Sequence, residues 1–76
     1  MPGGLTVEFT DYAELRMHQR DILREEVLAA LESPRSRHKS RADGRWEVTQ
    51  SIRRKALRVI YRRESALIIV INAMWD

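Results

Sequence analysis

The side chains best suited to chemistry in this sequence are basic ones that cluster between residues 45 and 63. Arginine presents a planar fork of N–H donors that matches a phosphate group in a bidentate way. Aromatic rings at Trp46, Tyr61 and Trp75 can stack on nucleobases, although Trp46 and Tyr61 also fit a protein core. This combination indicates binding of a polyanion such as RNA. The cations concerned are Arg45, Arg53, Arg54, Lys55, Arg58, Arg62 and Arg63.

Arg58 differs from the other cations because apolar residues surround it in the sequence. Leu57 and Val59 flank it, and Ile60 shares its side of the expected strand. A guanidinium that is shielded from water and left unpaired is costly. Arg58 is therefore either held in an ion pair for structural reasons or directed at an anion in a concave site, and the sequence leaves both open.

Several other chemistries are excluded by what the sequence lacks. There are three glycines, two of them at positions 3 and 4, so a glycine-rich phosphate loop is not expected. There is no cysteine, and His18 and His38 fall in different elements, so we expect no metal site and no cofactor. No serine stands in a nucleophile motif.

The elements that would position these side chains follow from hydrophobic periodicity. Helix-start residues at Thr10 and Asp11 predict a helix from about Tyr12, and the apolar stripe breaks between Arg20 and Arg24, where Asp21 is a candidate N-cap. The polar stretch 35–44 has no apolar anchor and is expected to be a mobile basic loop. The sequence thus predicts strands at 5–9, 45–52, 56–61 and 66–73, helices at about 12–20 and 21–32, and a hairpin tip at 53–55.

Alternation along the strands predicts which side chains face the core. Leu57, Val59 and Tyr61 share one side of their strand, whereas Arg58 and Arg62 share the other. Residues 66–73 are apolar on both sides, which is typical of a central strand covered on both faces. The expected fold is α+β, with two N-terminal helices packed on a twisted, mainly antiparallel four-stranded sheet in the order β-α-α-β-β-β.

Length and charge place the chain in a general class. Its 76 residues are enough for one domain, 1–76, with a flexible start at 1–4. Residues 1–34 hold three basic and seven acidic side chains, whereas residues 35–63 hold eleven basic and two acidic ones. The longest apolar run, 66–71, is far shorter than the roughly 20 residues that span a bilayer, and no leader is recognisable. We expect a cytoplasmic protein that does not bind membranes, with its basic half available to a polyanion.

The order of several short segments resembles a known family. The segments YAELRMHQRDI, EEVLAALESP, GRWEV, ALRVIYRR and IIVINAMW are similar to those of the small RelE/ParE-like family related to BrnT toxins, often described as a domain of unknown function. This resemblance implies a RelE-like fold. It also implies metal-independent ribonuclease activity, often on ribosome-bound messenger RNA, and neutralisation by a cognate antitoxin.

The resemblance assigns roles to individual residues of this chain. Arg58 corresponds to the arginine that faces the scissile phosphate and stabilises charge on it, while Arg53, Arg54 and Lys55 resemble the basic residues that hold RNA. Arginine does not lose its proton, so the base would be Lys55, Tyr61, Glu47 or His38. The candidate catalytic residues are Arg58, Lys55 and Tyr61, and the candidate RNA contacts are Arg45, Arg53, Arg54, Arg62 and Trp75.

Two functions remain open on these grounds. The first is a toxin-like RNA-binding protein of a toxin–antitoxin pair, with metal-independent endoribonuclease activity, whose partners are RNA or ribosome-bound mRNA and an antitoxin. The second is a noncatalytic module that keeps the toxin fold and uses a sheet edge and its basic patch to bind an acidic segment or a second copy of itself.

Overall fold

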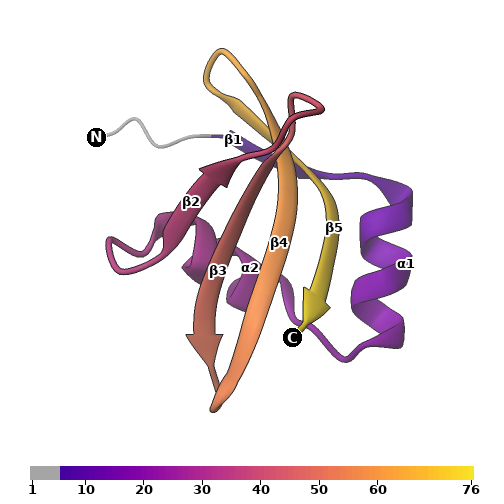
Figure 1. Cartoon of the computed structure of the whole chain (residues 1–76). Helices are drawn as coiled ribbons and strands as arrows, with labels where there is room; N and C mark the ends of the chain where they lie inside the picture. The colour runs from indigo at the N-terminus through magenta and orange to yellow at the C-terminus, as the bar shows by residue number, and fades with distance from the viewer. Residues whose placement is uncertain (1–5) are drawn as a thin grey trace.

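The elements follow one another in the order β-α-α-β-β-β-β in the computed structural model, which describes residues 6–76 (Figure 1). The flexible start predicted at 1–4, and residue 5 of the first predicted strand, lie outside the described residues. The elements are β1 (Thr6–Phe9), α1 (Asp11–Gln19), α2 (Arg24–Glu32), β2 (Arg37–Ser40), β3 (Trp46–Ile52), β4 (Lys55–Glu64) and β5 (Leu67–Trp75).

All the strands belong to one sheet in the order β1-β5-β4-β3-β2. The pairs β5–β4, β4–β3 and β3–β2 are antiparallel, whereas β1 runs parallel to β5. The predicted α+β class, with two N-terminal helices and a mainly antiparallel sheet, is confirmed. The predicted number of four strands is wrong, because the sheet is five-stranded and mixed.

The additional strand, β2, lies within the segment that was expected to be a mobile loop. All four of its residues are exposed, so β2 has no apolar side that could reveal it in the sequence. Its backbone pairs with β3, with His38 opposite Val48. The connection between the two strands contains Asp43 and Gly44, and Gly44 has a φ of 81°, a conformation that favours glycine. An Asp-Gly pair is a hairpin signal that the polarity of the segment concealed.

Both helices begin at residues whose side chains or neighbours satisfy the free backbone N–H groups. The hydroxyl of Thr10 accepts a hydrogen bond from the backbone N–H of Ala13, which starts α1. The predicted break between Arg20 and Arg24 is confirmed. Asp21 is not the N-cap of α2, because it takes a φ of 58° in the turn, and Leu23 occupies the cap instead. The carboxylate of Glu26 accepts the backbone N–H of Leu23 and so replaces a polar cap.

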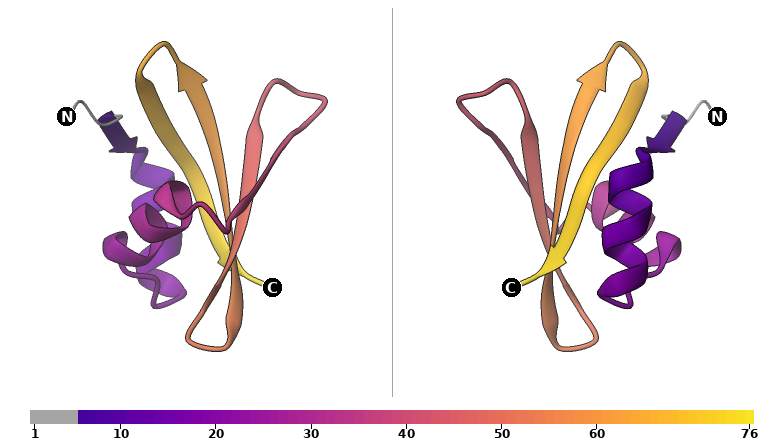
Figure 2. Two further views of the ribbon diagram at one scale, coloured as in Figure 1. Left: turned by 90° about the vertical axis from the view of Figure 1, so that its left-hand side faces the viewer. Right: turned by 90° about the vertical axis from the view of Figure 1, so that its right-hand side faces the viewer.

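The helices lie on the same side of the sheet, as the two side views in Figure 2 show. The predicted inward residues of β4, Leu57, Val59 and Tyr61, are buried beneath them, and Trp46 packs against the same core. We call the opposite side of the sheet the open face. The expectation that β5 is covered on both faces is wrong, because the helices cover one face and Ile69 and Ile71 remain half-buried.

The second half of β5 is bordered by α1 instead of a strand. β1 pairs only with residues 67–70 of β5, and a bulge follows, where the register with β4 shifts between Ile60 and Tyr61. Beyond it, the guanidinium of Arg20 donates to the carbonyl of Ala73 at 2.8 Å, and the indole N–H of Trp75 donates to the carbonyl of Arg20 at 2.8 Å. These bonds hold α1 along the border of the sheet.

The hairpin between β3 and β4 is tighter than predicted, because Lys55 already pairs with Ile52. Arg53 and Arg54 form the turn, with φ values of 51° and 67°. Positive φ at both central positions is typical of a type I′ turn, whose twist matches that of the flanking strands. Neither helix of the described chain is long and apolar enough to cross a membrane.

Candidate nucleic-acid interface

The register of the sheet brings basic side chains from β2 and β4, and from the connection between β2 and β3, onto the open face. Residues directly opposite each other in an antiparallel pair project to the same side. Lys39 lies opposite Glu47, Arg37 lies opposite Thr49, and Thr49 lies opposite Arg58. We call this set of open-face cations the cationic track. It consists of Arg37, Lys39, Arg41, Arg45, Arg58 and Arg62.

A groove of about 410 Å³ lies between the open face and the N-terminal end of α1. Arg41, Arg45 and Arg58 line it, and Tyr12 contributes from α1. Its apolar lining comes from β4 and β5: Ile60, Ile71 and Met74. Ile60 is 6% exposed although it does not belong to the helix-side core, so side chains on the open face shield it from water.

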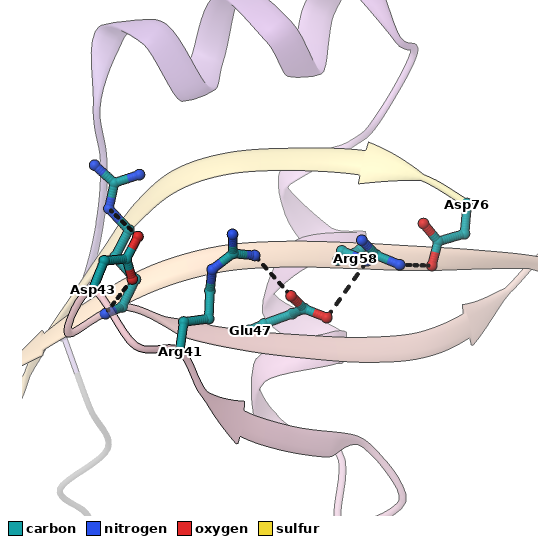
Figure 3. Close-up of polar contacts among 6 residues, drawn as sticks. Arg41, Asp43, Glu47, Arg58 and Asp76 are labelled. Carbon is teal, nitrogen blue, oxygen red and sulfur yellow. Dashed lines mark hydrogen bonds and ion pairs between the residues drawn. The ribbon is translucent and has the colours of Figure 1, made fainter.

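Carboxylates link Arg41 and Arg58 of this groove in a chain of ion pairs (Figure 3). Glu47 lies 2.9 Å from the guanidinium of Arg41 and 3.6 Å from the Nε of Arg58. Asp76 lies 2.8 Å from an Nη of Arg58. Arg58 is therefore ion-paired, as the first alternative requires, and it also lines a groove, which leaves its role toward an anion as a prediction. Among the described residues, no acceptor lies within hydrogen-bond distance of its buried Nε.

These ion pairs neutralise only part of the cationic track. Arg45 pairs weakly with Asp43 at 3.8 Å, and Arg62 pairs with Glu64 at 3.3 Å. Within residues 6–76, no carboxylate lies at ion-pair distance from Arg37 or Lys39. Exposed pairs of this kind contribute about 0–1 kcal/mol each, so a phosphate group can replace the carboxylate.

The three predicted catalytic residues are not brought together. Arg58 projects from the open face, whereas Lys55 and Tyr61 belong to the other side of β4 by alternation. The ammonium of Lys55 lies 5.4 Å from the ring centre of Trp75, in a cation–π contact. Tyr61 is 2% exposed in the core beneath the helices. An anion at Arg58 is thus separated from both by the sheet.

The remaining predicted RNA contacts divide between the two sides of the sheet. Arg45 and Arg62 belong to the cationic track. Arg53 instead reaches α2, where its Nε lies 2.7 Å from the carboxylate of Glu26, and its guanidinium also lies 5.5 Å from the ring centre of Trp75. Trp75 packs against the core, and the side chains of Arg53 and Lys55 lie over its ring. Arg54 lies in the turn.

A second polar cluster lies on the helix side, where His38 meets Tyr61. The Nδ1 of His38 lies 2.7 Å from the Tyr61 hydroxyl, and Trp46 stacks on the ring of Tyr61. The guanidinium of Arg63 lies 5.8 Å from the centre of the Trp46 ring. Burial raises the pKa of Tyr61, opposed by the charge of Arg63. Partial burial, and then the same positive charge, lower the pKa of His38.

The lowered pKa of His38 predicts a loss of stability in mild acid. The unfolded chain, in which His38 has a pKa near 6.5, binds a proton that the folded chain resists. The free energy of unfolding should therefore fall as the pH drops through and below about 6.5. Urea unfolding at a series of pH values measures this change. The variant His38→Asn should lose the part of this pH dependence that comes from His38 and keep the part that comes from carboxylates. Identical pH profiles of the free energy of unfolding for the two proteins would contradict the prediction.

Sequence reasoning missed several residues of the interface. The sequence predicts a loop for Arg37, Lys39 and Arg41, whereas Arg37 and Lys39 lie on β2 and Arg41 directly follows it. The Asp43-Gly44 turn signal is the feature of the sequence that indicates a hairpin here. The pairing of Asp76 with Arg58 depends on the register of β4 and β5, for which no short motif exists. Among the described residues 6–76, no three His, Asp or Glu side chains gather in a way that could hold a metal ion.

Comparison with known proteins identifies no relative of this chain. No family model, no curated protein and no solved structure matches the chain.

Proposed function

We propose that this protein is a toxin-like RNA-binding protein and that its open face binds the RNA backbone. The observation that carries the proposal is the cationic track, which extends over β2, β3 and β4 on one side of the sheet. Because β3 lies between β2 and β4, the cations of these two strands are about 10 Å apart, so the cationic track can contact more than one phosphate group of an extended RNA backbone. The resemblance to RelE/ParE-like toxins supports the same assignment.

Cleavage of the bound RNA would require more than Arg58. Breaking the backbone through the 2′-hydroxyl needs a base, an acid and stabilisation of charge on the phosphate. Arg58 supplies the stabilisation, and the nearest titratable groups are the carboxylates of Glu47 and Asp76. We propose Glu47 as the base if the protein cleaves RNA, because Lys55 and Tyr61 lie on the other side of β4.

The binding proposal is tested by the salt dependence of affinity for a single-stranded RNA. Each phosphate contact contributes about 0.7 to the slope of log affinity against log salt. The double variant Arg37→Ala/Lys39→Ala should weaken binding to all sequences and reduce this slope by about 1.4. The matched control is Arg54→Ala/Lys55→Ala, which removes the same charge at the hairpin turn and should leave the slope nearly unchanged. A larger loss of slope in the control than in the Arg37→Ala/Lys39→Ala variant would place RNA at the turn. An affinity of the parent protein that does not change with salt would refute RNA binding.

The enzymatic part of the proposal needs a separate assay. We expect the parent protein to cleave mRNA in a ribosome-containing translation extract without added metal, and Arg58→Ala to abolish cleavage at the same folded concentration. Loss of activity in Glu47→Gln, with RNA binding retained, would support Glu47 as the base. If the parent leaves mRNA intact, the protein binds RNA without cleaving it.

A noncatalytic interaction module is the second candidate, and the position of β2 favours it. β2 is the last strand of the sheet formed by residues 6–76, so within this described part of the chain one side of its backbone has no strand partner. Such an edge can accept an extended segment, and the basic side chains of β2 favour an acidic one or a second copy of the chain. Light scattering of the purified protein, and titration with an acidic peptide, distinguish these outcomes from RNA binding.

A further inference from the structure

The groove beside Arg58 has a composition that a site for phosphate alone would not need. Besides Arg41, Arg45 and Arg58, it is lined by the ring of Tyr12 and by the apolar side chains of Ile60, Ile71 and Met74. A bare phosphate is recognised by charge and hydrogen bonds, whereas an unpaired nucleobase is recognised by stacking and apolar contact. The groove offers both within about 410 Å³, which falls in the usual size range of small-ligand sites.

Tyr12 is placed to supply the stacking surface. It lies in the first turn of α1, at the border where that helix runs along β5, and half of its surface is exposed. The guanidinium of Arg16 lies 5.4 Å from the centre of its ring and covers one face. Arg16 follows one helical turn later, so the helix itself holds the ring in place. An exposed aromatic side chain held in this way, at the rim of a cationic groove, has no role in the core.

We propose that the groove holds one unpaired nucleobase, which stacks on Tyr12 while its phosphate contacts Arg41, Arg45 or Arg58. This inference rests on the proposed function and deepens it, because it names the substrate class as single-stranded RNA with an accessible base. Double-stranded RNA keeps its bases paired and stacked, so it presents only its backbone to the open face.

The test compares two probes that carry the same charge. One is a short oligouridylate, and the other is an abasic ribose-phosphate oligomer of equal length. The parent should bind the oligouridylate about tenfold more tightly, which is within the range measured for stacking of one base on an aromatic side chain. Tyr12→Ala should bind both probes equally and keep the affinity of the parent for the abasic oligomer. Tyr12→Phe retains the ring and should retain the preference.

Leu15→Ala is the matched control, because Leu15 is also an exposed apolar residue of α1 and does not line the groove. It should behave as the parent does. Equal affinity of the parent for the two probes, or a preference that survives in Tyr12→Ala, would overturn the stacking site while leaving backbone binding intact. Failure of the parent to bind either probe would instead refute the proposed function itself.

Discussion

Replacement of Tyr61 by alanine is expected to remove a large part of the free energy of unfolding. The ring of Tyr61 is among the largest fully buried side chains, and Trp46 stacks on it. Truncation of a buried aromatic side chain to alanine costs about 3–5 kcal/mol. A domain of this length has a total stability of about 4–11 kcal/mol, at 0.05–0.15 kcal/mol per residue. Urea unfolding followed by tryptophan fluorescence measures the loss, with Trp46 as a nearby reporter.

The variant Tyr61→Phe separates the structural role of the ring from any chemical role of the hydroxyl. It keeps the buried ring and removes the hydrogen bond to His38, which should cost about 1 kcal/mol. RNA affinity and any cleavage should be unchanged, because Tyr61 lies on the helix side of β4 and Arg58 on the open face. Loss of cleavage by a fully folded Tyr61→Phe would show that the hydroxyl takes part in the reaction and that the separation of the two faces is misleading.

The parts of the fold that local patterns predict are those in which burial controls the sequence. Leu57, Val59 and Tyr61 stand at every second position because one side of β4 faces the core, and this period of two predicted a strand here and its core-facing residues correctly. β2 was not predicted because it lies at the edge of the sheet with every side chain exposed, so its sequence has no apolar residues at alternate positions. The parallel pairing of β1 with β5 joins residues about sixty positions apart, and only the complete sheet specifies it.

The candidate site shows the same division. Alternation placed Arg58 and Arg62 on one side of β4, and the structure agrees. The ion-pair partners of Arg58 could not be predicted from local patterns, because Glu47 lies on an adjacent strand and Asp76 follows β5. The need for a base grouped Lys55 and Tyr61 with Arg58 as candidate catalytic residues, yet a spacing of three residues along a strand puts both on the opposite side from Arg58.

Neutralising Asp76 should strengthen RNA binding, whereas neutralising Arg58 should weaken it. The Asp76 carboxylate lies 2.8 Å from Arg58, where it occupies a position that a phosphate oxygen would take. RNA must displace this contact before it can use the guanidinium fully. We therefore expect Asp76→Asn to raise affinity roughly threefold, and Arg58→Gln to lower it roughly tenfold, equivalent to about 0.7 and 1.4 kcal/mol. Fluorescence anisotropy at fixed salt measures both.

Removal of any carboxylate makes the protein more positive, so a gain in affinity needs a control of equal charge. Glu64→Gln provides it, because Glu64 pairs with Arg62 at 3.3 Å at an exposed site on the cationic track. The gain from Asp76→Asn should exceed that from Glu64→Gln, since Asp76 competes directly for Arg58. In an Arg58→Gln background, the two gains should become equal, because only the general change in charge remains. Equal gains in RNA affinity from Asp76→Asn and Glu64→Gln in the parent background would show that Asp76 acts only through its charge and does not compete with RNA for Arg58.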